Sequence, residues 1–553
     1  MFGIVKNPAL SGATIVATPA TAGLIPILGA VETRAWGRRL AWSTAIFSLA
    51  TGISRILGLV REVVARRYFG VDGSGINAFT VAFQLPNLVR QLVSDAALSG
   101  AFVPVFSELL EKGERARAWR VASTLFWLIL LVLGGLTALL IVAAPLIVAP
   151  FDLADEELGI TLSRLLFPIV ALLGVSGIVV GILNSYEHFS VPALSPVFWN
   201  LAIIVGLVVG VPRTDSTTDA LYVYAGAILV GTVIQVLLPV PWLRRLDGQL
   251  RVAIDWRDPA VKQVLVLMVP VTLGLGLINF SAVIGTFFAS RYIDPELAPA
   301  AIDAAFRIYM LPQGMFSVAV ATVLFPAISR LAARADFDGF RRTVGLGLRQ
   351  IGFLLLPASA ASLVLAEPIV RLLYERGEFG SAETEVVAEA LAAFSIGLTF
   401  NGMMLMLNRG FFGLQAPWTP TLVALGNLAL NTALFAAFYR VGVWGIPLAI
   451  SLANVAGAAA LLVLLRRRLG RIDFRETAVS LLRIVGASIV LAAVCYAVWE
   501  PLDDVLGRSF GAQLLSLGIA LGAGLAAYVI SCRLLGVREL DALLSLRARL
   551  RRS

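Results

Sequence analysis

The sequence predicts an all-α polytopic membrane protein with fourteen transmembrane helices. Of its 553 residues, 59% are hydrophobic and only 14% are charged, whereas a soluble globular chain carries about 25% charged residues. Residues 121–151 contain no charge at all, and about 20 apolar residues cross a bilayer as a helix. These runs are apolar all round, while a membrane barrel alternates polar and apolar residues. The pattern therefore excludes a barrel.

Apolar stretches bounded by charges and turn residues define the predicted helices, of which the first, second and eighth are the least hydrophobic. The fourteen ranges are 43–68, 77–108, 121–150, 158–186, 193–211, 218–242, 262–290, 299–329, 343–366, 384–408, 416–438, 443–465, 477–499 and 510–532.

The basic residues alternate in number between successive loops. With both termini in the cytoplasm, 29 of the 44 Lys and Arg residues fall in cytoplasmic segments and 8, among them Arg66 and Arg371, in outer segments. Because cytoplasmic loops carry an excess of Lys and Arg, this pattern predicts both termini inside. It also explains the net charge of +9 without a nucleic-acid partner.

The chain contains an internal repeat. Phe102-Val-Pro-Val-Phe-Ser107 matches Leu324-Phe-Pro-Ala-Ile-Ser329 at a displacement of 222 residues, which moves the first helix onto the seventh in the same orientation. Such parallel repeats occur in alternating-access transporters, with the site between the halves. The predicted organisation is a poorly ordered cytoplasmic extension (1–42), an N-lobe (43–258), a C-lobe (259–470), helices 13–14 (471–536) and a basic cytoplasmic tail (537–553).

A charge inside a membrane helix costs at least about 2.5–3.5 kcal/mol, and five of the charged residues inside predicted helices are candidates for a functional site. They are Arg55, Arg61, Glu62, Arg90 and Arg307. Prolines near two of them, Pro86 and Pro312, are expected to kink helices 2 and 8. One interpretation is that the four arginines line a water-filled cavity between the lobes, since each guanidinium can bind phosphate bidentately. The alternative is that they snorkel to the headgroups, as we expect for Arg164, Arg349 and Arg483.

The sequence lacks clustered Cys and His residues with metal spacing and a Gly-rich phosphate loop with a Lys. We therefore expect no metal, no cofactor and no ATP-driven transport by this chain alone. The loops are too short for a soluble active-site domain, so an enzyme is not expected. Cys495 and Cys532 lie in apolar stretches and His188 in a turn, and we interpret all three as structural.

Three motifs resemble the opening signature of the lipid II flippase family: Ser54-Arg-Ile-Leu-Gly-Leu-Val-Arg-Glu62, Phe83-Gln-Leu-Pro-Asn-Leu-Val-Arg90 and Phe102-Val-Pro-Val-Phe106. Two further segments, Gly181–Pro192 and Leu373–Phe379, are similar to later parts of that family. The resemblance covers roughly residues 43–540 and implies membership of the multidrug/oligosaccharidyl-lipid/polysaccharide exporter superfamily, with a fold of two six-helix lobes around a cationic cavity.

The resemblance further implies that the substrate is the undecaprenyl-diphosphate-linked peptidoglycan precursor, flipped between leaflets of the bacterial cytoplasmic membrane by a monomer. The cell-wall synthesis complex is a candidate partner. The essential arginines of the family fall on Arg55, Arg61, Arg90 and Arg307, with Glu62 as the carboxylate. Helices 13 and 14 would form a groove for the lipid tail, lined by small residues: Gly518, Gly522, Gly524, Ala526 and Ala527.

The chain departs from the family pattern at several positions. Asn77 and Phe306 stand where many members have an acid, and Gln91 replaces an Arg. Gly285 replaces an Asp that some members offer to sodium, although Asn427 and Asn431 lie one turn apart in helix 11. Substrate binding is compatible with these changes, whereas a sodium site is in doubt.

Three other functions are alternatives. A multidrug exporter of the same superfamily usually has twelve helices and takes cationic drugs, which four arginines would repel. A flippase for another lipid-linked oligosaccharide would use the same diphosphate chemistry. A membrane glycosyltransferase is the remote alternative, because such enzymes need a catalytic carboxylate on a sizeable outer loop.

Overall fold

The computed structural model describes residues 49–540 except 94, 187, 189 and 471–473; the side chains of 89–100, 269–279, 474 and 475 are also outside the description. The predicted extension 1–42 and most of the predicted tail therefore lie outside the described residues. Helices joined by short turns make up the described part of the chain, where no strand occurs. The all-α prediction is confirmed.

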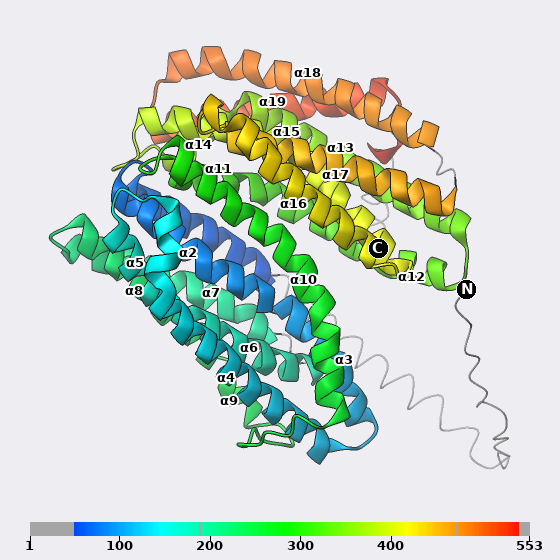
Figure 1. Ribbon diagram of the computed structural model, residues 1–553. Coiled ribbons are helices and arrows are strands. Elements are labelled where there is room, and N and C mark those ends of the chain that lie inside the picture. The colour runs from blue at the N-terminus through cyan, green and yellow to red at the C-terminus, as the bar shows by residue number, and fades with distance from the viewer. Residues whose placement is uncertain (1–48, 94, 187, 189, 471–473, 541–553) are drawn as a thin grey trace.

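The first lobe occupies the lower half of Figure 1. Its elements are a helix over residues 49–69, α2 (Ser74–Val93), α3 (Asp95–Glu111), α4 (Arg115–Val148), η1 (Ala149–Phe151), α5 (Glu156–Leu166), α6 (Pro168–Ser185), α7 (Ser190–Val205), η2 (Gly206–Gly210), η3 (Val211–Arg213), α8 (Thr217–Leu237) and α9 (Val240–Leu243).

The second lobe and the two last helices occupy the upper half of Figure 1, except α10 (Pro259–Phe288), which runs down beside α3 into the lower half. They comprise α10, η4 (Ala289–Ile293), α11 (Ala298–Pro312), η5 (Gln313–Ser317), α12 (Val318–Ala333), α13 (Phe337–Val364), α14 (Ala366–Tyr374), α15 (Ser381–Gly413), α16 (Trp418–Phe438), η6 (Tyr439–Val441), α17 (Gly445–Leu469), α18 (Phe474–Leu506) and α19 (Phe510–Leu534).

Eleven helical segments of the described chain are long and apolar enough to cross a membrane. The three predicted spans missing from this set are the first, the second and the seventh, so the count of fourteen stays a prediction. The eighth qualifies as Ala298–Ala333, because α11, η5 and α12 follow one another without a gap. At Pro312 the α-helix ends and a π-helical turn begins, whereas α2 continues through Pro86.

Side-chain caps fix where several helices start. Asp155, Ser216, Asp336 and Ser509 each accept a hydrogen bond from the backbone N–H three residues later, which satisfies a donor that the first helical turn leaves free. All but Asp336 precede helices that start at one end of the bundle. We call this the Arg-poor end and the opposite one, which holds the loops 112–114, 244–258 and 334–336, the Arg-rich end.

The two lobes share one apolar core toward the Arg-poor end. Phe79 and Tyr224 of the first lobe belong to the same buried cluster as Ala304 and Phe394 of the second. A separate cluster around Phe106 and the start of α4 contains residues of the first lobe and of the adjoining α10, and lies toward the Arg-rich end. The lobes are thus joined most extensively at the Arg-poor end.

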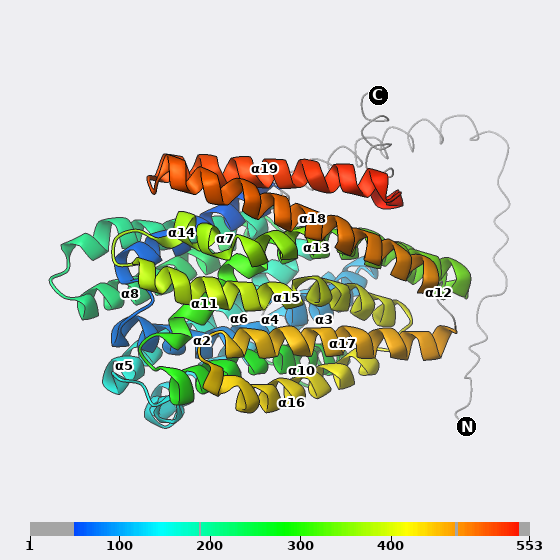
Figure 2. The same ribbon diagram turned by 90° about the horizontal axis from the view of Figure 1, so that it is seen from above.

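Helices α18 and α19 lie along one edge of the bundle, beside α13 (Figure 2). Tyr528 donates to the Phe353 carbonyl at 2.7 Å, and both residues lie in a buried cluster that joins α13 to α18 and α19. The small residues of α19 serve two different purposes. A Cβ at Gly524 would collide with the Cys495 sulfur, whereas Gly518 and Gly522 face open space. Gly524 therefore packs against α18, whereas Gly518, Gly522 and Ala526 belong to an exposed face.

Two arginines lie in surroundings that the sequence did not indicate. Arg371, expected in an outer loop, is buried in α14 and forms an ion pair with Asp503 of α18. Arg349, expected to snorkel, donates from Nε to Glu539 at 2.8 Å. The sequence did not indicate these partners, because the carboxylates lie more than 100 residues away in sequence and come close only when α18 and α19 pack against the second lobe; the placement of Arg371 in the outer segment and the snorkelling of Arg349 stay predictions.

Candidate functional site between the lobes

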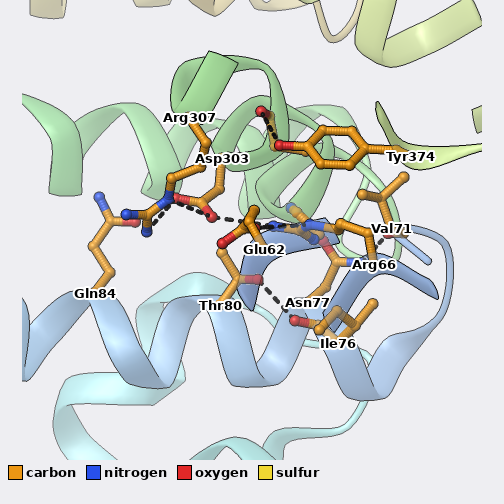
Figure 3. Close-up of polar contacts among 12 residues, drawn as sticks. Glu62, Arg66, Val71, Ile76, Asn77, Thr80, Gln84, Asp303, Arg307 and Tyr374 are labelled. Carbon is orange, nitrogen blue, oxygen red and sulfur yellow. Dashed lines mark hydrogen bonds and ion pairs between the residues drawn. The ribbon is translucent and has the colours of Figure 1, made fainter. Parts of the chain in front are cut away.

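Five charged side chains form a continuous row from the first helix to α11, and Figure 3 labels four of them, Glu62, Arg66, Asp303 and Arg307. Glu62 contacts Arg66 at 2.9 Å and Arg61 at 3.8 Å. Arg66 also reaches Asp303 at 3.1 Å, and Asp303 pairs with Arg307 at 3.0 Å. The Arg66–Asp303 contact crosses from one lobe to the other. Each carboxylate lies between two guanidiniums, which makes burial of the charges tolerable.

Helical periodicity explains which residues meet. Glu62 and Arg66 are four residues apart on the first helix, and Asp303 and Arg307 are four apart on α11, so each pair shares a helix face. Tyr374, buried on α14, donates to the Ala304 carbonyl at 3.4 Å and packs over the same turn of α11. The row is therefore built from two short intrahelical pairs that one interhelical ion pair joins.

Arg61 extends to the side of the row, against α7. Its Nη1 donates to Asn200 at 3.3 Å, and its guanidinium lies 4.8 Å from the centre of the Trp199 ring. Asn200 in turn donates to the Ser54 carbonyl. The Nε of Arg61 is buried and has no hydrogen-bond partner among the described residues, so one donor of this guanidinium is unused there.

Arg55 and Arg307 form the accessible part of the site. Arg55 is exposed and makes no hydrogen bond or ion pair with any described residue. It nevertheless lies against the second lobe, since a Cβ at Gly314 of η5 would be 2.7 Å from its Nη1. The side chain of Arg307 is 34% exposed, compared with 5% for Arg66. Of the cations in this site, these two are therefore the ones that an anion can approach.

The described site carries two positive charges in excess, because Arg55, Arg61, Arg66 and Arg307 face only Glu62 and Asp303. Arg90 belongs to α2, but its side chain lies outside the described residues. The convergence of all four predicted arginines on one cavity therefore stays a prediction.

The sequence interpretation missed two members of the row. Arg66 was placed among the outer-loop residues, yet it is 4% exposed and ion-paired. Asp303 was not singled out, although it precedes Arg307 by one helical turn. The spacing could have revealed Asp303. Phe306 stands directly before Arg307 in place of an acid, and Asp303, four residues before Arg307, is the nearest acid on the same helix face.

Next to this row, the lobes are sealed at the Arg-poor end. The buried carboxylate of Glu383 accepts from the Val71 and Asp72 backbone N–H groups at 2.7 and 2.9 Å. Asn77 donates to the Glu296 carbonyl and accepts from the Ala300 N–H at 2.8 Å. An Asp at position 77 could not donate to a carbonyl. The amide of Asn77 therefore suits this contact better than the acid found in many related proteins.

The expectation that helices 7 and 11 lack a sodium site stays a prediction. A Cβ at Gly285 would contact Ile446 and Phe435, so the surroundings are apolar. Within the described residues, no group of three or more His, Cys, Asp or Glu side chains could hold a metal ion.

Comparison with known proteins places this geometry in context. The model of the family described as "Lipid II flippase MurJ" matches residues 65–507. The chain is 31% identical to a lipid II flippase MurJ of Burkholderia cenocepacia, over 81% of this chain and 87% of the relative. It is 32% identical to a probable lipid II flippase MurJ of Rhizobium tropici, over 88% of this chain and 92% of the relative.

Solved structures agree on the fold. A lipid II flippase MurJ in an inward closed conformation is similar with a TM-score of 0.73 and 23% identity, covering 88% of this chain and 99% of that one. A multidrug resistance transporter of the MATE family in the MOP superfamily, in its inward-facing conformation, is similar with a TM-score of 0.65 and 18% identity. The match covers 77% of this chain and 95% of that one.

The row predicts a specific instability. Glu62→Gln leaves Arg66 with one carboxylate instead of two in a buried place, and breaking a buried pair costs about 3–5 kcal/mol. We expect a clear fall in the apparent Tm of the detergent-solubilised protein. Glu108→Gln, which removes the exposed partner of Lys112, is the control and should leave Tm unchanged. Equal Tm values for the two variants would contradict the pairing.

Proposed function

The chain belongs to the lipid II flippase MurJ family, and from this membership and the cationic row we propose that it carries the lipid-linked peptidoglycan precursor across the bacterial membrane. The observation that supports this most directly is the pair of accessible arginines, Arg55 and Arg307, at the contact between the lobes. They offer guanidinium forks where a diphosphate headgroup would have to lose its water.

The physical problem is charge transfer through hydrocarbon. A diphosphate carries about two negative charges, and an ion without compensation costs tens of kcal/mol in a medium of low dielectric constant. Charge-assisted hydrogen bonds from Arg replace hydration with fixed donors. The excess of two positive charges in the described site matches the headgroup, while Glu62 and Asp303 keep the empty site from being a cluster of unpaired cations.

The carboxylates also give the site a way to respond to its substrate. Asp303 holds Arg307 on one side and Arg66 on the other. A diphosphate bound to Arg307 competes with Asp303 for that guanidinium and also repels the Asp303 carboxylate, which moves the carboxylate away from the position in which it holds Arg66 across the lobe boundary. Substrate binding then favours the conformation in which the lobes separate at the Arg-poor end.

We assign the Arg-poor end to the outer face, because the loops at the opposite end carry most of the basic residues. Both termini are then cytoplasmic. On this assignment the structure is closed outside by Glu383 and Asn77, so the site is reached from the cytoplasmic leaflet, where the precursor is made.

A multidrug exporter is the main alternative, since transporters of the MATE family share the fold. The excess positive charge of the site disfavours cationic drugs. A flippase for another lipid-linked oligosaccharide would present the same diphosphate. Rescue of a bacterium depleted of its own lipid II flippase separates these functions, because neither alternative would restore growth.

For the tail, we propose the exposed face of α19 beside α18. Gly518 and Gly522 have open space next to them, and Leu525 and Ala526 are exposed on the same helix. A polyprenyl chain too long and apolar for a cationic site can lie along such a face while the headgroup crosses.

The first prediction concerns the arginines. Ala at Arg55, Arg61, Arg90 or Arg307 should abolish or sharply reduce rescue of the depleted strain, while Lys should restore only part of it because the bidentate fork is lost. Arg213→Ala, at an exposed position, is the control. Membrane levels of each variant are measured by immunoblot. Normal growth of all four Ala variants at normal levels would exclude the diphosphate role.

The second prediction concerns the contact between the lobes. Asp303→Asn should loosen the closed end, so that a cysteine replacing the buried Ala300 reacts faster with a membrane-impermeant maleimide added outside whole cells. Asp338→Asn, in an exposed pair with Arg341, is the matched control. The native Cys495 and Cys532 are buried and give little background. An unchanged labelling rate in Asp303→Asn would show that the ion pair does not hold the lobes.

The third prediction tests the tail surface. Gly522→Leu or Ala526→Leu should impair rescue without lowering Tm, because both positions are exposed. Gly135→Leu also faces open space, on α4 of the other lobe, and should be neutral. If all three variants behave alike, the tail does not use α19.

A further inference from the structure

The connection between α9 and α10 presents an apolar edge that the transport mechanism does not use. Residues 249–257, here called the strap, run beside α4 without forming a helix (Figure 1). Val252, Ile254 and Trp256 are 81%, 55% and 70% exposed. They alternate with Ala253 and Asp255, which are less exposed, so the three large side chains share one side of an extended segment.

The strap is fixed to α4 by hydrogen bonds along its backbone. The Arg251 N–H donates to the Ser123 hydroxyl at 3.1 Å, and Trp127 Nε1 donates to the Arg251 carbonyl at 3.0 Å. The Asp255 N–H donates to the Thr124 hydroxyl at 3.1 Å. Non-helical backbone is tolerated at membrane depth only where protein groups satisfy its polar atoms. The side chains of α4 do this for the face of the strap that is turned toward them.

These anchor residues lie at the level of the membrane interface. The uncharged run of α4 and η1 spans residues 121–151, about 46 Å at 1.5 Å per residue, which exceeds a hydrocarbon core of about 30 Å. If the run is centred, roughly 8 Å at each end lies in the interfacial layer. Ser123, Thr124 and Trp127 fall at or near that layer, and the strap lies beside them.

The charges of the strap match the same location. Arg251 and Arg257 are exposed, while two of the neighbouring acids, Asp247 and Asp258, are engaged with other arginines of the protein. Asp258 accepts two hydrogen bonds from Arg117 at 3.0 Å, and these bonds hold its pKa below the ordinary value. Asp247 pairs with Arg115 at 3.0 Å. The arginines therefore remain available to anionic headgroups, and Trp is enriched at membrane interfaces.

We propose that the strap is a membrane-interface anchor, which inserts Val252, Ile254 and Trp256 between lipids of the leaflet at the Arg-rich end and binds anionic phospholipid headgroups through Arg251 and Arg257. The strap leads directly into α10, the first helix of the second lobe. Its anchorage fixes the connection between the lobes to the first lobe and to the bilayer, independently of what the protein transports.

The test is spin labelling of the full chain in nanodiscs. Single cysteines replace Val252, Ile254, Trp256 or, as the matched control on the same strap, the exposed polar Gln249. Labels at the three apolar positions should show a several-fold higher ratio of oxygen to nickel-chelate accessibility than the label at Gln249. If the ratios at these three positions equal the ratio at Gln249, the apolar side chains lie in water and the proposed membrane anchor is wrong.

The lipid charge is tested in the same samples. Replacing part of the phosphatidylcholine with phosphatidylglycerol should slow the label at Ile254→Cys, and Arg251→Gln with Arg257→Gln should remove that difference. Insertion without any effect of phosphatidylglycerol would overturn the assignment of the arginines. Thermal unfolding confirms that the variants are folded, since the exposed side chains they replace make none of the hydrogen bonds to α4.

Discussion

The contact between Arg66 and Asp303 is the interaction on which the site depends. Each residue belongs to an intrahelical pair, with Glu62 on the first helix and with Arg307 on α11. When the lobes come together, Arg66 gains a second carboxylate and Asp303 gains a second guanidinium, so each buried charge is better compensated than within its own helix. Burying charges is costly, and the compensation is obtained across the boundary between the lobes. The same boundary is the one that has to open during transport.

This arrangement makes the empty site a stable but reversible structure. Backbone hydrogen bonds at the Arg-poor end, with Glu383 and Asn77 as the side-chain partners, close the protein over the row. These bonds involve loop residues and helix starts rather than interdigitated core side chains, so they can be exchanged for water when the lobes separate. The Arg66–Asp303 ion pair of the charged row is the interlobe contact that an anionic substrate can influence.

The surroundings of the row also show how a family pattern can change while its electrostatics are kept. Phe306 stands where many members of the family have an acid. The centre of its ring lies 5.6 Å from the centre of the Phe394 ring. The carboxylate is supplied by Asp303 one turn earlier, and Arg66 adds a cation opposite it. Because residues four apart share a helix face, the acid can move by one turn and still meet Arg307.

The sequence alone determined the features that follow from local composition. Apolar length predicts the all-α membrane class, and the cost of intramembrane charge singles out Arg55, Arg61, Glu62, Arg90 and Arg307. These inferences need only the properties of a residue and its near neighbours. Tertiary structure alone decided which residues become partners. Arg66 and Asp303 are 237 residues apart in the sequence, and Arg61 and Asn200 are 139 residues apart. Periodicity within a helix does not encode contacts between residues so far apart in sequence, because these contacts depend on how the helices and lobes pack.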